Sequence, residues 1–246
     1  MKVSGKIALV TGAAQGLGKA FAAALLENGA KVLICDVNSE TGEATLKTFQ
    51  EKYGENNVMF VRADVTSQAQ MEAVFHQVRE RFGGLDIMSN NAGIVGEASD
   101  VWEKTVDVNL KGVIRGTNLA LDLMRQDKGG RGGVIINTAS IAGVMPVRGF
   151  EVYTATKHGI VGFTRSWAEN PLCLDNGVRM NALCPSMADT TLVPRDAADF
   201  VKYYENHGLM SPEYVAEGFM DLIQDDSKNG AVLKMMQKVG KVYMEY

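Results

Sequence analysis

The stretch "KIALVTGAAQGLGKAFAAALLENGAKVLICD" (residues 6–36) decides the fold, because it joins two short apolar runs through a glycine-rich turn and a helix. The runs "KIALV" (6–10) and "KVLICD" (31–36) are nearly unbroken, as expected for strands that are covered on both faces. Between them, apolar residues at helical spacing predict a helix over 17–28 that stops at Gly29. A strand, a helix and a second strand in this order indicate parallel pairing through a right-handed crossover.

The same alternation of strands and helices continues along the whole chain. Further strands are expected at 57–64, 85–93, 133–140, 178–185 and 231–235, and further helices at 39–52, 67–82, 101–126, 151–169 and, once or twice, within 195–224. No internal repeat or linker interrupts the pattern. The sequence therefore predicts an α/β fold over 1–246, a single-domain, doubly wound (Rossmann-type) parallel sheet of about seven strands with helices on both faces.

Composition excludes several classes of function. The 246 residues carry a formal net charge of −4 and are 46% hydrophobic, which suits a soluble protein with ample core. Mild acidity gives no indication of nucleic-acid binding, no apolar run approaches the ~20 residues of a membrane-spanning helix, and no signal peptide is expected. Three cysteines without CxxC spacing and three histidines without ligand spacing indicate reduced thiols in a cytoplasmic protein and no metal site.

The glycine-rich turn has the composition of a dinucleotide site. Gly12, Gly16 and Gly18 permit a tight turn and a close approach of the backbone to a pyrophosphate at a helix N-terminus. Their GxxxGxG spacing departs from the GxGxxG fingerprint, so a plain strand–helix turn is the alternative. Asp36 ends the second strand, where a carboxylate can accept hydrogen bonds from a ribose diol and repel a 2′-phosphate. With no cation beside it in the sequence, Asp36 favours NAD over NADP.

Two later strands also end in polar residues. Asp64 follows the third strand and could either meet the adenine amino group or cap the next helix. "NNAG" (90–93) follows the fourth strand and either touches the cofactor or only stabilises its turn. Ligands of such sheets bind at the carboxyl ends of the strands, so both are candidates for the same site.

Tyr153 and Lys157 stand four positions apart and share one face of the predicted helix 151–169. An ammonium beside a phenol favours the phenolate and lowers its pKa, which makes the tyrosine a better base; for an isolated pair the alternative is a solvated helix face. Ser140 ends the fifth strand and could hydrogen-bond a substrate oxygen, although serine is also a common turn residue. Asn109 is a poor residue for the middle of a helix, which indicates either a functional bend or a tolerated defect.

Together these motifs occur in an order that resembles the short-chain dehydrogenase/reductase family over the whole chain. The resemblance implies hydride transfer between a nicotinamide and an alcohol or carbonyl carbon. The catalytic residues that it implies are Tyr153 as general base, Lys157 as the cation that lowers the tyrosine pKa and binds the ribose, Ser140 as the group that orients the substrate oxygen, and Asn109 as the holder of a water molecule.

The resemblance also implies a binding set for NAD and a mode of assembly. The set comprises Gly12, Gln15, Gly16, Leu17, Gly18, Asp36, Val37, Ala63, Asp64, Val65, Asn91, Ala92, Gly93, Tyr153, Lys157, Pro185, Ala188 and Thr190. In the family the long helix and the tyrosine helix pair across a twofold axis, so a homodimer is expected and a tetramer is an alternative.

Within the family, stretches such as "WEKT" (102–105) and "KHGIVGFTRS" (157–166) resemble the branch that oxidises 15-hydroxyprostaglandins. The expected reaction is oxidation of a secondary hydroxyl on a hydrophobic substrate. The first expectation for that substrate is a 15-hydroxyprostaglandin or a related hydroxylated fatty acid. The candidate substrate-binding residues are Ser140, Val147, Phe150, Tyr153, Met187, Leu192, Tyr203 and Tyr204. The alternatives are a dehydrogenase or carbonyl reductase for other alcohols, steroids or ketones, and an NAD-binding scaffold or sensor with little turnover.

Three departures from that branch affect the substrate pocket and the cofactor turn. Phe150 stands where the branch has a glutamine, and Ser186 replaces the glycine that usually follows Pro185. The substrate-covering segment, expected at about 190–212, looks shortened, which predicts a different and more open pocket.

Overall fold

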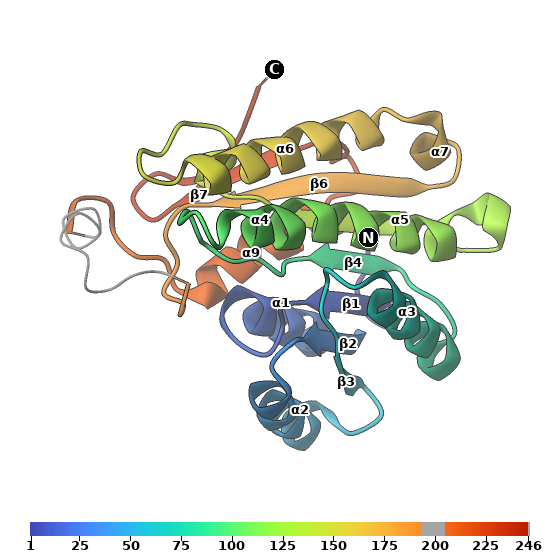
Figure 1. Ribbon diagram of the computed structural model, residues 1–246. Coiled ribbons are helices and arrows are strands. Elements are labelled where there is room, and N and C mark those ends of the chain that lie inside the picture. The colour runs from blue at the N-terminus through green and yellow to red at the C-terminus, as the bar shows by residue number, and fades with distance from the viewer. Residues whose placement is uncertain (193–204, 246) are drawn as a thin grey trace.

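The structure, a computed structural model, describes residues 1–192 and 205–245, which form a layered α/β arrangement (Figure 1). Its strands are β1 (Ile7–Thr11), β2 (Lys31–Asp36), β3 (Val58–Arg62), β4 (Ile87–Asn90), β5 (Gly133–Thr138), β6 (Val178–Pro185), β7 (Val232–Met236) and β8 (Gly240–Tyr243). They form one eight-stranded sheet in the order β3-β2-β1-β4-β5-β6-β7-β8, and every pair except β7–β8 is parallel. The predicted fold class is confirmed.

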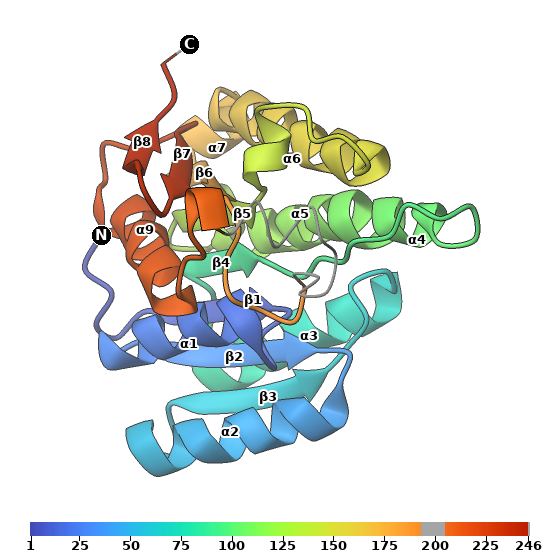
Figure 2. The ribbon, with the colours of Figure 1, turned by 90° about the vertical axis from the view of Figure 1, so that its left-hand side faces the viewer.

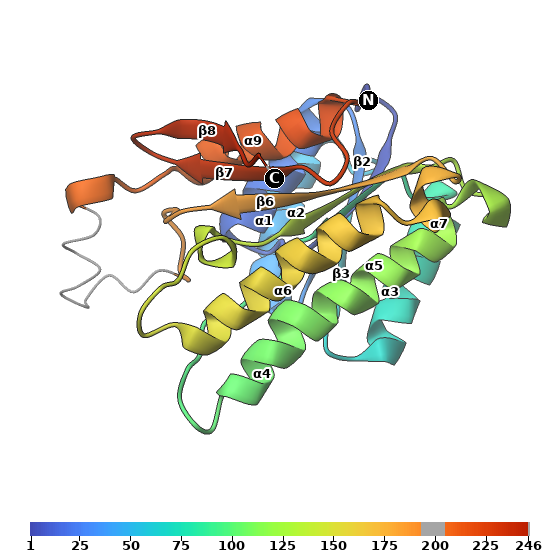
Figure 3. The same cartoon turned by 90° about the horizontal axis from the view of Figure 1, so that it is seen from above.

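The helices cover both faces of this sheet. They are α1 (Gly16–Glu27), α2 (Ser39–Tyr53), α3 (Gln68–Phe82), α4 (Trp102–Val106), η1 (Asp107–Lys111), α5 (Gly112–Met124), η2 (Gln126–Lys128), η3 (Ile141–Gly143), α6 (Glu151–Ala168), α7 (Pro171–Leu174) and α9 (Pro212–Gln224). Helices α1, α2 and α9 lie on one face, and α3, α5 and α6 lie on the other (Figure 2). Seen from above, α4, α5 and α6 run side by side along their face (Figure 3).

The apolar strands separate two cores. All five residues of β1 are buried, and their side chains alternate between the two clusters, Ala8 and Val10 on one face and Ile7 and Leu9 on the other. On the first face, α1 packs on α9 through stacked rings of Phe21 and Phe219, whose centroids lie 4.4 Å apart.

The switch in strand order positions the site. Strand β1 pairs with β2 on one side and with β4 on the other, so the chain changes its direction of winding beside β1. The loops that follow these strands diverge at their carboxyl ends and leave a crevice, which is where open α/β sheets bind ligands.

Two elements differ from the expectations. The sheet has an eighth strand beyond the expected number of about seven, because β8 returns antiparallel to β7 through a turn between Met236 and Gly240, and Gly240 has φ +85°. Four residues are too few for a periodic signal to be recognised. The expected continuous helix over 101–126 is interrupted by the π-helical turn η1, which separates α4 from α5.

Candidate functional site

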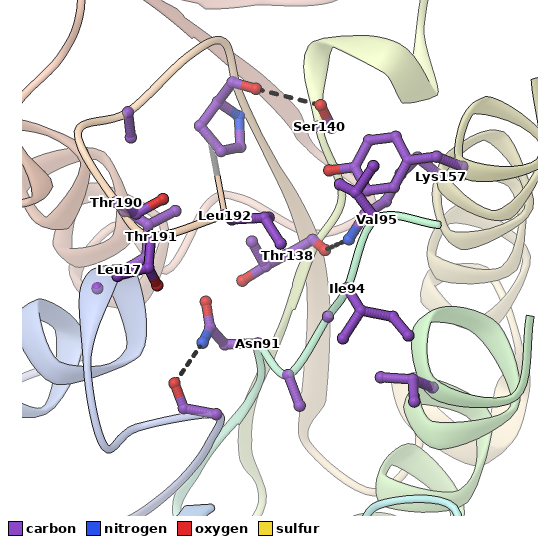
Figure 4. A pocket seen from close by; sticks show the side chains of 18 of the residues that line it. Leu17, Asn91, Ile94, Val95, Thr138, Ser140, Lys157, Thr190, Thr191 and Leu192 are labelled. Carbon is purple, nitrogen blue, oxygen red and sulfur yellow. Dashed lines mark hydrogen bonds between the residues drawn. The ribbon is translucent and has the colours of Figure 1, made fainter. Parts of the chain in front are cut away.

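A cavity of about 570 Å³ lies at the carboxyl ends of the strands, between the glycine turn and helix α6. The loops that follow β1 to β6 all contribute to its wall. In Figure 4, Ser140 and Lys157 lie on one side of this cavity, and Leu17, Asn91 and Thr190 lie on the other. One continuous space therefore connects the two groups of predicted site residues.

The glycine turn needs its glycines for two different reasons. Gly12 and Gly16 have φ +64° and φ +57°, a left-handed conformation that side chains disfavour, and both line the cavity. Gly18 lies away from the cavity wall; a Cβ there would stand 2.1 Å from the Gly12 carbonyl oxygen and 2.6 Å from Asn91 Nδ2. Gly18 thus permits the close packing of the turn, whereas Gly12 and Gly16 shape the surface that faces the cavity.

Asp36 closes the far end of the cavity. Its Oδ2 accepts a hydrogen bond from the Ala14 N–H at 3.0 Å, and its Oδ1 accepts one from the Asn38 N–H at 3.0 Å. Each oxygen keeps further acceptor capacity for a ligand hydroxyl. Beside it, the Val37 side chain is 55% exposed, which leaves an apolar surface at the cavity rim.

The third strand ends in Ala63, Asp64 and Val65, and all three line the cavity. Asp64 Oδ1 accepts hydrogen bonds from both the backbone N–H and the hydroxyl of Thr66 at 2.8 Å. The N-cap of α3 is Ser67, so Asp64 orders the turn before that helix and leaves the capping to its neighbour.

Asn91 fastens the fourth loop to the glycine turn. Its Nδ2 donates to the carbonyl oxygens of Thr11 and Gly12 at 3.0 and 3.1 Å, and the backbone N–H groups of Asn91 and Ala92 donate to the Thr11 hydroxyl. Asn91, Ala92 and Gly93 all line the cavity as well. The two readings of "NNAG", a structural turn and a cavity wall, are therefore compatible.

Tyr153 and Lys157 share one face of α6, as predicted, with Nζ 5.4 Å from the tyrosine ring centroid. Lys157 is 3% exposed and donates a hydrogen bond to the Thr138 carbonyl oxygen at 2.8 Å. Burial raises the pKa of Tyr153 to about 12, against an opposing hydrogen bond with Ser140, and burial lowers the pKa of Lys157 to about 8. In the protein alone the pKa of Tyr153 is thus raised, because desolvation is the dominant effect, and the lowering of that pKa by Lys157 stays a prediction.

Ser140 joins the fifth and sixth strand ends. Its Oγ accepts from the Ala142 N–H at 3.2 Å, which caps η3, and donates to the Pro185 carbonyl oxygen at 3.4 Å. It also hydrogen-bonds Tyr153. The hydroxyl therefore stands beside the phenol at the cavity wall.

Asn109 lies in the π-helical turn and is fully buried. Its Oδ1 accepts from the Ile94 N–H at 2.8 Å, while Nδ2 donates to the Ile94 carbonyl oxygen at 2.9 Å and to Thr156 Oγ1 at 3.4 Å. Both amide protons are thus engaged within the chain, and Asn109 lies behind the cavity wall. Asn109 therefore lies at a bend of the helix, and π turns are frequent at functional sites. The water molecule that the resemblance implies for Asn109 stays a prediction.

The remaining substrate candidates divide into two groups. Val147, Phe150, Met187 and Leu192 line the cavity near Ser140 and Tyr153. Tyr203 and Tyr204 lie outside the described residues. Further residues that the sequence did not predict as site residues also line the cavity, namely Cys35, Asn38, Ile94, Val95, Lys104, Val108, Thr138, Ala139, Ile141, Ala142, Ser186 and Thr191.

The sixth strand end carries the remaining predicted cofactor residues. Pro185, Ala188 and Thr190 all line the cavity, and a Cβ at Gly16 would lie 3.3 Å from Thr190. The amide of Gln15 donates to Thr191 Oγ1 at 3.0 Å. The chain after β6 therefore covers the glycine turn from the outside.

The described part of the chain, residues 1–192 and 205–245, contains no group of three or more His, Cys, Asp or Glu residues that could hold a metal ion. Within the same ranges no helix is both long and apolar enough to cross a membrane.

Comparisons with known proteins agree with this geometry. The family model described as short chain dehydrogenase matches residues 6–199. The chain is 43% identical over 261 residues to 15-hydroxyprostaglandin dehydrogenase [NAD(+)] of Homo sapiens, with 100% of this chain and 96% of that protein covered. It is 38% identical over 197 residues to 3beta-hydroxysteroid dehydrogenase 2 of Eggerthella lenta, covering 77% of this chain and 74% of the relative.

A solved structure shows the same fold. The crystal structure of levodione reductase superposes with a TM-score of 0.86 at 30% sequence identity and covers 95% of this chain and 96% of its own. The family match over residues 6–199 includes the glycine turn and the Tyr153 helix, and the alignment with the human relative covers the whole chain. The chain belongs to the short chain dehydrogenase family.

Proposed function

We propose that this protein oxidises the secondary hydroxyl of a hydrophobic substrate with NAD, and that the substrate is a 15-hydroxyprostaglandin or a related hydroxylated fatty acid. The identity to relatives of that name over the whole chain supports the substrate class. The lining beside Ser140 and Tyr153, which includes Val147, Phe150 and Leu192, is mostly apolar and suits a lipid alcohol.

The residues present fit a dinucleotide. The left-handed glycine turn at the N-terminus of α1 presents backbone amides to an anion, and Asp36 offers acceptor oxygens to a ribose diol at the far end of the same cavity. Val37 and Val65 supply apolar contact for an adenine ring. A bound oxidised nicotinamide would supply the hydride acceptor and a positive charge near the phenol.

The side chains at the other end carry the proton chemistry. The Ser140 hydroxyl, whose single proton turns from the Pro185 carbonyl to the substrate oxygen, holds that oxygen next to Tyr153. The phenolate oxygen of Tyr153 takes the substrate's hydroxyl proton. Lys157, fixed by the Thr138 carbonyl, is the cation next to that phenol. Asn109 acts through Ile94 and Thr156, by fixing the loop and helix that flank the pair.

One observation carries the proposal: a single cavity is lined both by Asp36, which ends β2, and by Ser140, Tyr153 and Lys157, which follow β5, a strand separated from β2 in the sheet by β1 and β4. The test is production of NADH from NAD+ and a 15-hydroxyprostaglandin by the wild type and by Tyr153→Phe. We expect the variant to retain NADH binding and to lose turnover by about 10²–10⁴-fold, the usual contribution of a positioned acid or base. Equal turnover in the two proteins would contradict the role of Tyr153.

Carbonyl reduction with NADPH is the second candidate, because Arg62 is the register partner of Asp36 on the neighbouring strand and could meet a 2′-phosphate. Asp36 itself disfavours that phosphate. Comparing the Kd of NADH and NADPH for the wild type and for Asp36→Ala tests the choice. We expect the wild type to prefer NADH, and the variant to lose roughly tenfold or more of that preference.

The remaining parts of the proposal concern organisation. We infer a single domain over 1–246, with the substrate covered by a segment at about 190–212. We also propose a cytoplasmic homodimer formed through α5 and α6, whose side-by-side course on one face supports such a contact. Size-exclusion chromatography with light scattering tests the dimer.

A further inference from the structure

The first turn of α6 carries Tyr153, and the side chain of its N-cap residue makes no capping hydrogen bond. The N-cap residue, Phe150, has an apolar side chain, which cannot accept a hydrogen bond from the first backbone N–H groups. Those N–H groups have no partner inside a helix and need an acceptor from elsewhere. Tyr153 is the third residue of the helix, so the acceptor also decides where its backbone is held.

That acceptor is Glu97, from the loop between β4 and α4. Its Oε2 accepts from the Val152 N–H at 2.8 Å and its Oε1 accepts from the Tyr153 N–H at 2.9 Å. Both oxygens of one carboxylate thus bind adjacent N–H groups, and the negative charge stands at the positive end of an 18-residue helix. Residues more than fifty positions apart in the chain are joined at the reacting tyrosine.

The loop that carries Glu97 is itself fixed at two points before this residue. At its start, the Asn109 side chain exchanges two hydrogen bonds with the backbone of Ile94. One residue before Glu97, the Gly96 carbonyl oxygen accepts from Thr105 Oγ1 at 2.8 Å. A Cβ at Gly96 would lie 3.1 Å from Thr105 Oγ1 and 3.1 Å from Val101 Cγ2, so the loop packs closely on the start of α4.

The same loop is also a wall of the site, because Ile94 and Val95 line the cavity (Figure 4). A displacement of Glu97 therefore moves the start of α6 relative to Ser140, which is fixed to β6 through Pro185. We propose that Glu97 is a positioning residue: its carboxylate holds Tyr153 at the reacting distance from the substrate oxygen. This inference rests on the proposed function, in which Tyr153 is the base.

The test compares Glu97→Ala and Glu97→Gln with the wild type, using a 15-hydroxyprostaglandin and its analogue deuterated at C15. We expect kcat of Glu97→Ala to fall roughly 10–100-fold, the loss that a misplaced reacting group produces. Glu97→Gln keeps one acceptor oxygen but turns an NH₂ group toward the second N–H, so its kcat should lie between the two. The primary deuterium effect on kcat should rise in both variants, because the chemical step becomes slower.

Two controls separate positioning from folding and from charge. NADH binding, measured by fluorescence titration, should stay within about twofold of the wild type, since no cofactor contact is removed. Glu151→Gln removes a carboxylate of the same first turn, one that accepts from the Gly149 N–H, and it should leave kcat unchanged. Far-UV circular dichroism verifies the fold of every variant.

The outcomes are distinguishable. A kcat of Glu97→Ala within about twofold of the wild type overturns the inference alone, provided that Tyr153→Phe is inactive. Loss of NADH binding in both Glu97 variants overturns it too, because the residue then serves folding. An active Tyr153→Phe, or a wild type that makes no NADH, overturns the proposed function and the inference with it.

Discussion

Replacing Lys157 with methionine should make the protein more stable while it abolishes turnover. The ammonium is buried at 3% exposure, and burial lowers its pKa from 10.5 to about 8. A lysine whose pKa is lowered in this way costs the folded state about 3 kcal/mol at pH 7, since one pKa unit corresponds to about 1.4 kcal/mol. Methionine has a similar length and carries no charge to desolvate.

The gain is reduced by one lost contact. Lys157 donates to the Thr138 carbonyl oxygen at 2.8 Å, and methionine leaves that buried acceptor without this partner. Such a loss costs roughly 1–2 kcal/mol. The expected net gain is about 1–2 kcal/mol, which corresponds to a rise in Tm of about 2–8 °C for a chain of this size.

The pH dependence gives this prediction a second, independent signature. Below pH 8 the lysine is protonated in both the folded and unfolded states, so the full cost is present. Between pH 8 and 10.5 the folded state loses the proton while the unfolded state keeps it, so the wild type gains stability and the advantage of Lys157→Met shrinks.

Thermal and urea unfolding of the cofactor-free proteins, followed by circular dichroism between pH 6.5 and about 10, measure both effects. The wild type without ligand is the reference, because ligand binding would add its own stabilisation. A variant that is less stable than the wild type at pH 7, or an advantage that does not shrink above pH 8, would refute the reasoning.

Two further predictions concern the base and the turn. Ser140→Ala removes the hydrogen bond that lowers the pKa of Tyr153, so the acid limb of kcat/KM for alcohol oxidation should move to higher pH; an unmoved or lower limb in the pH–rate profile contradicts this. Gly18→Ala places a Cβ 2.1 Å from the Gly12 carbonyl oxygen, so NADH affinity, measured by fluorescence titration, should fall about tenfold or more. The control is Gly162→Ala, where a Cβ meets no described heavy atom within 4 Å, and its NADH affinity should match that of the wild type.

Much of the fold follows from the sequence, because its signals are local and repeated. Apolar runs of five or six residues, such as Ile7–Thr11 and Lys31–Asp36, have room for only one buried strand each, and the intervening helices force parallel pairing. Because all parallel strands end at the same edge, residues such as Asp36 and Ser140 had to converge there. The structure brings both to one cavity.

The features that escaped prediction depend on contacts between distant segments. A mid-helix asparagine indicates a bend. The role of the π turn is visible only from the hydrogen bond that the Ile94 N–H donates to Asn109 Oδ1, which joins the turn to a distant loop. Glu97 has no motif around it, and its role exists only because its loop reaches the start of α6. The antiparallel strand Gly240–Tyr243 is equally invisible, since a short edge strand depends on its neighbour for its geometry.

For Tyr153 and Lys157 too, the sequence predicts the position of the side chains but not their protonation. Four-residue spacing is sufficient to place Tyr153 and Lys157 side by side, but the direction of their pKa shifts depends on how much water the fold removes. Burial favours the neutral form of each, which opposes the phenolate that an alcohol dehydrogenase needs. The low dielectric that produces this opposition also strengthens the effect of any positive charge that enters the cavity. The tyrosine is therefore held as a neutral phenol in the protein alone, and its basicity depends on what occupies the space in front of it.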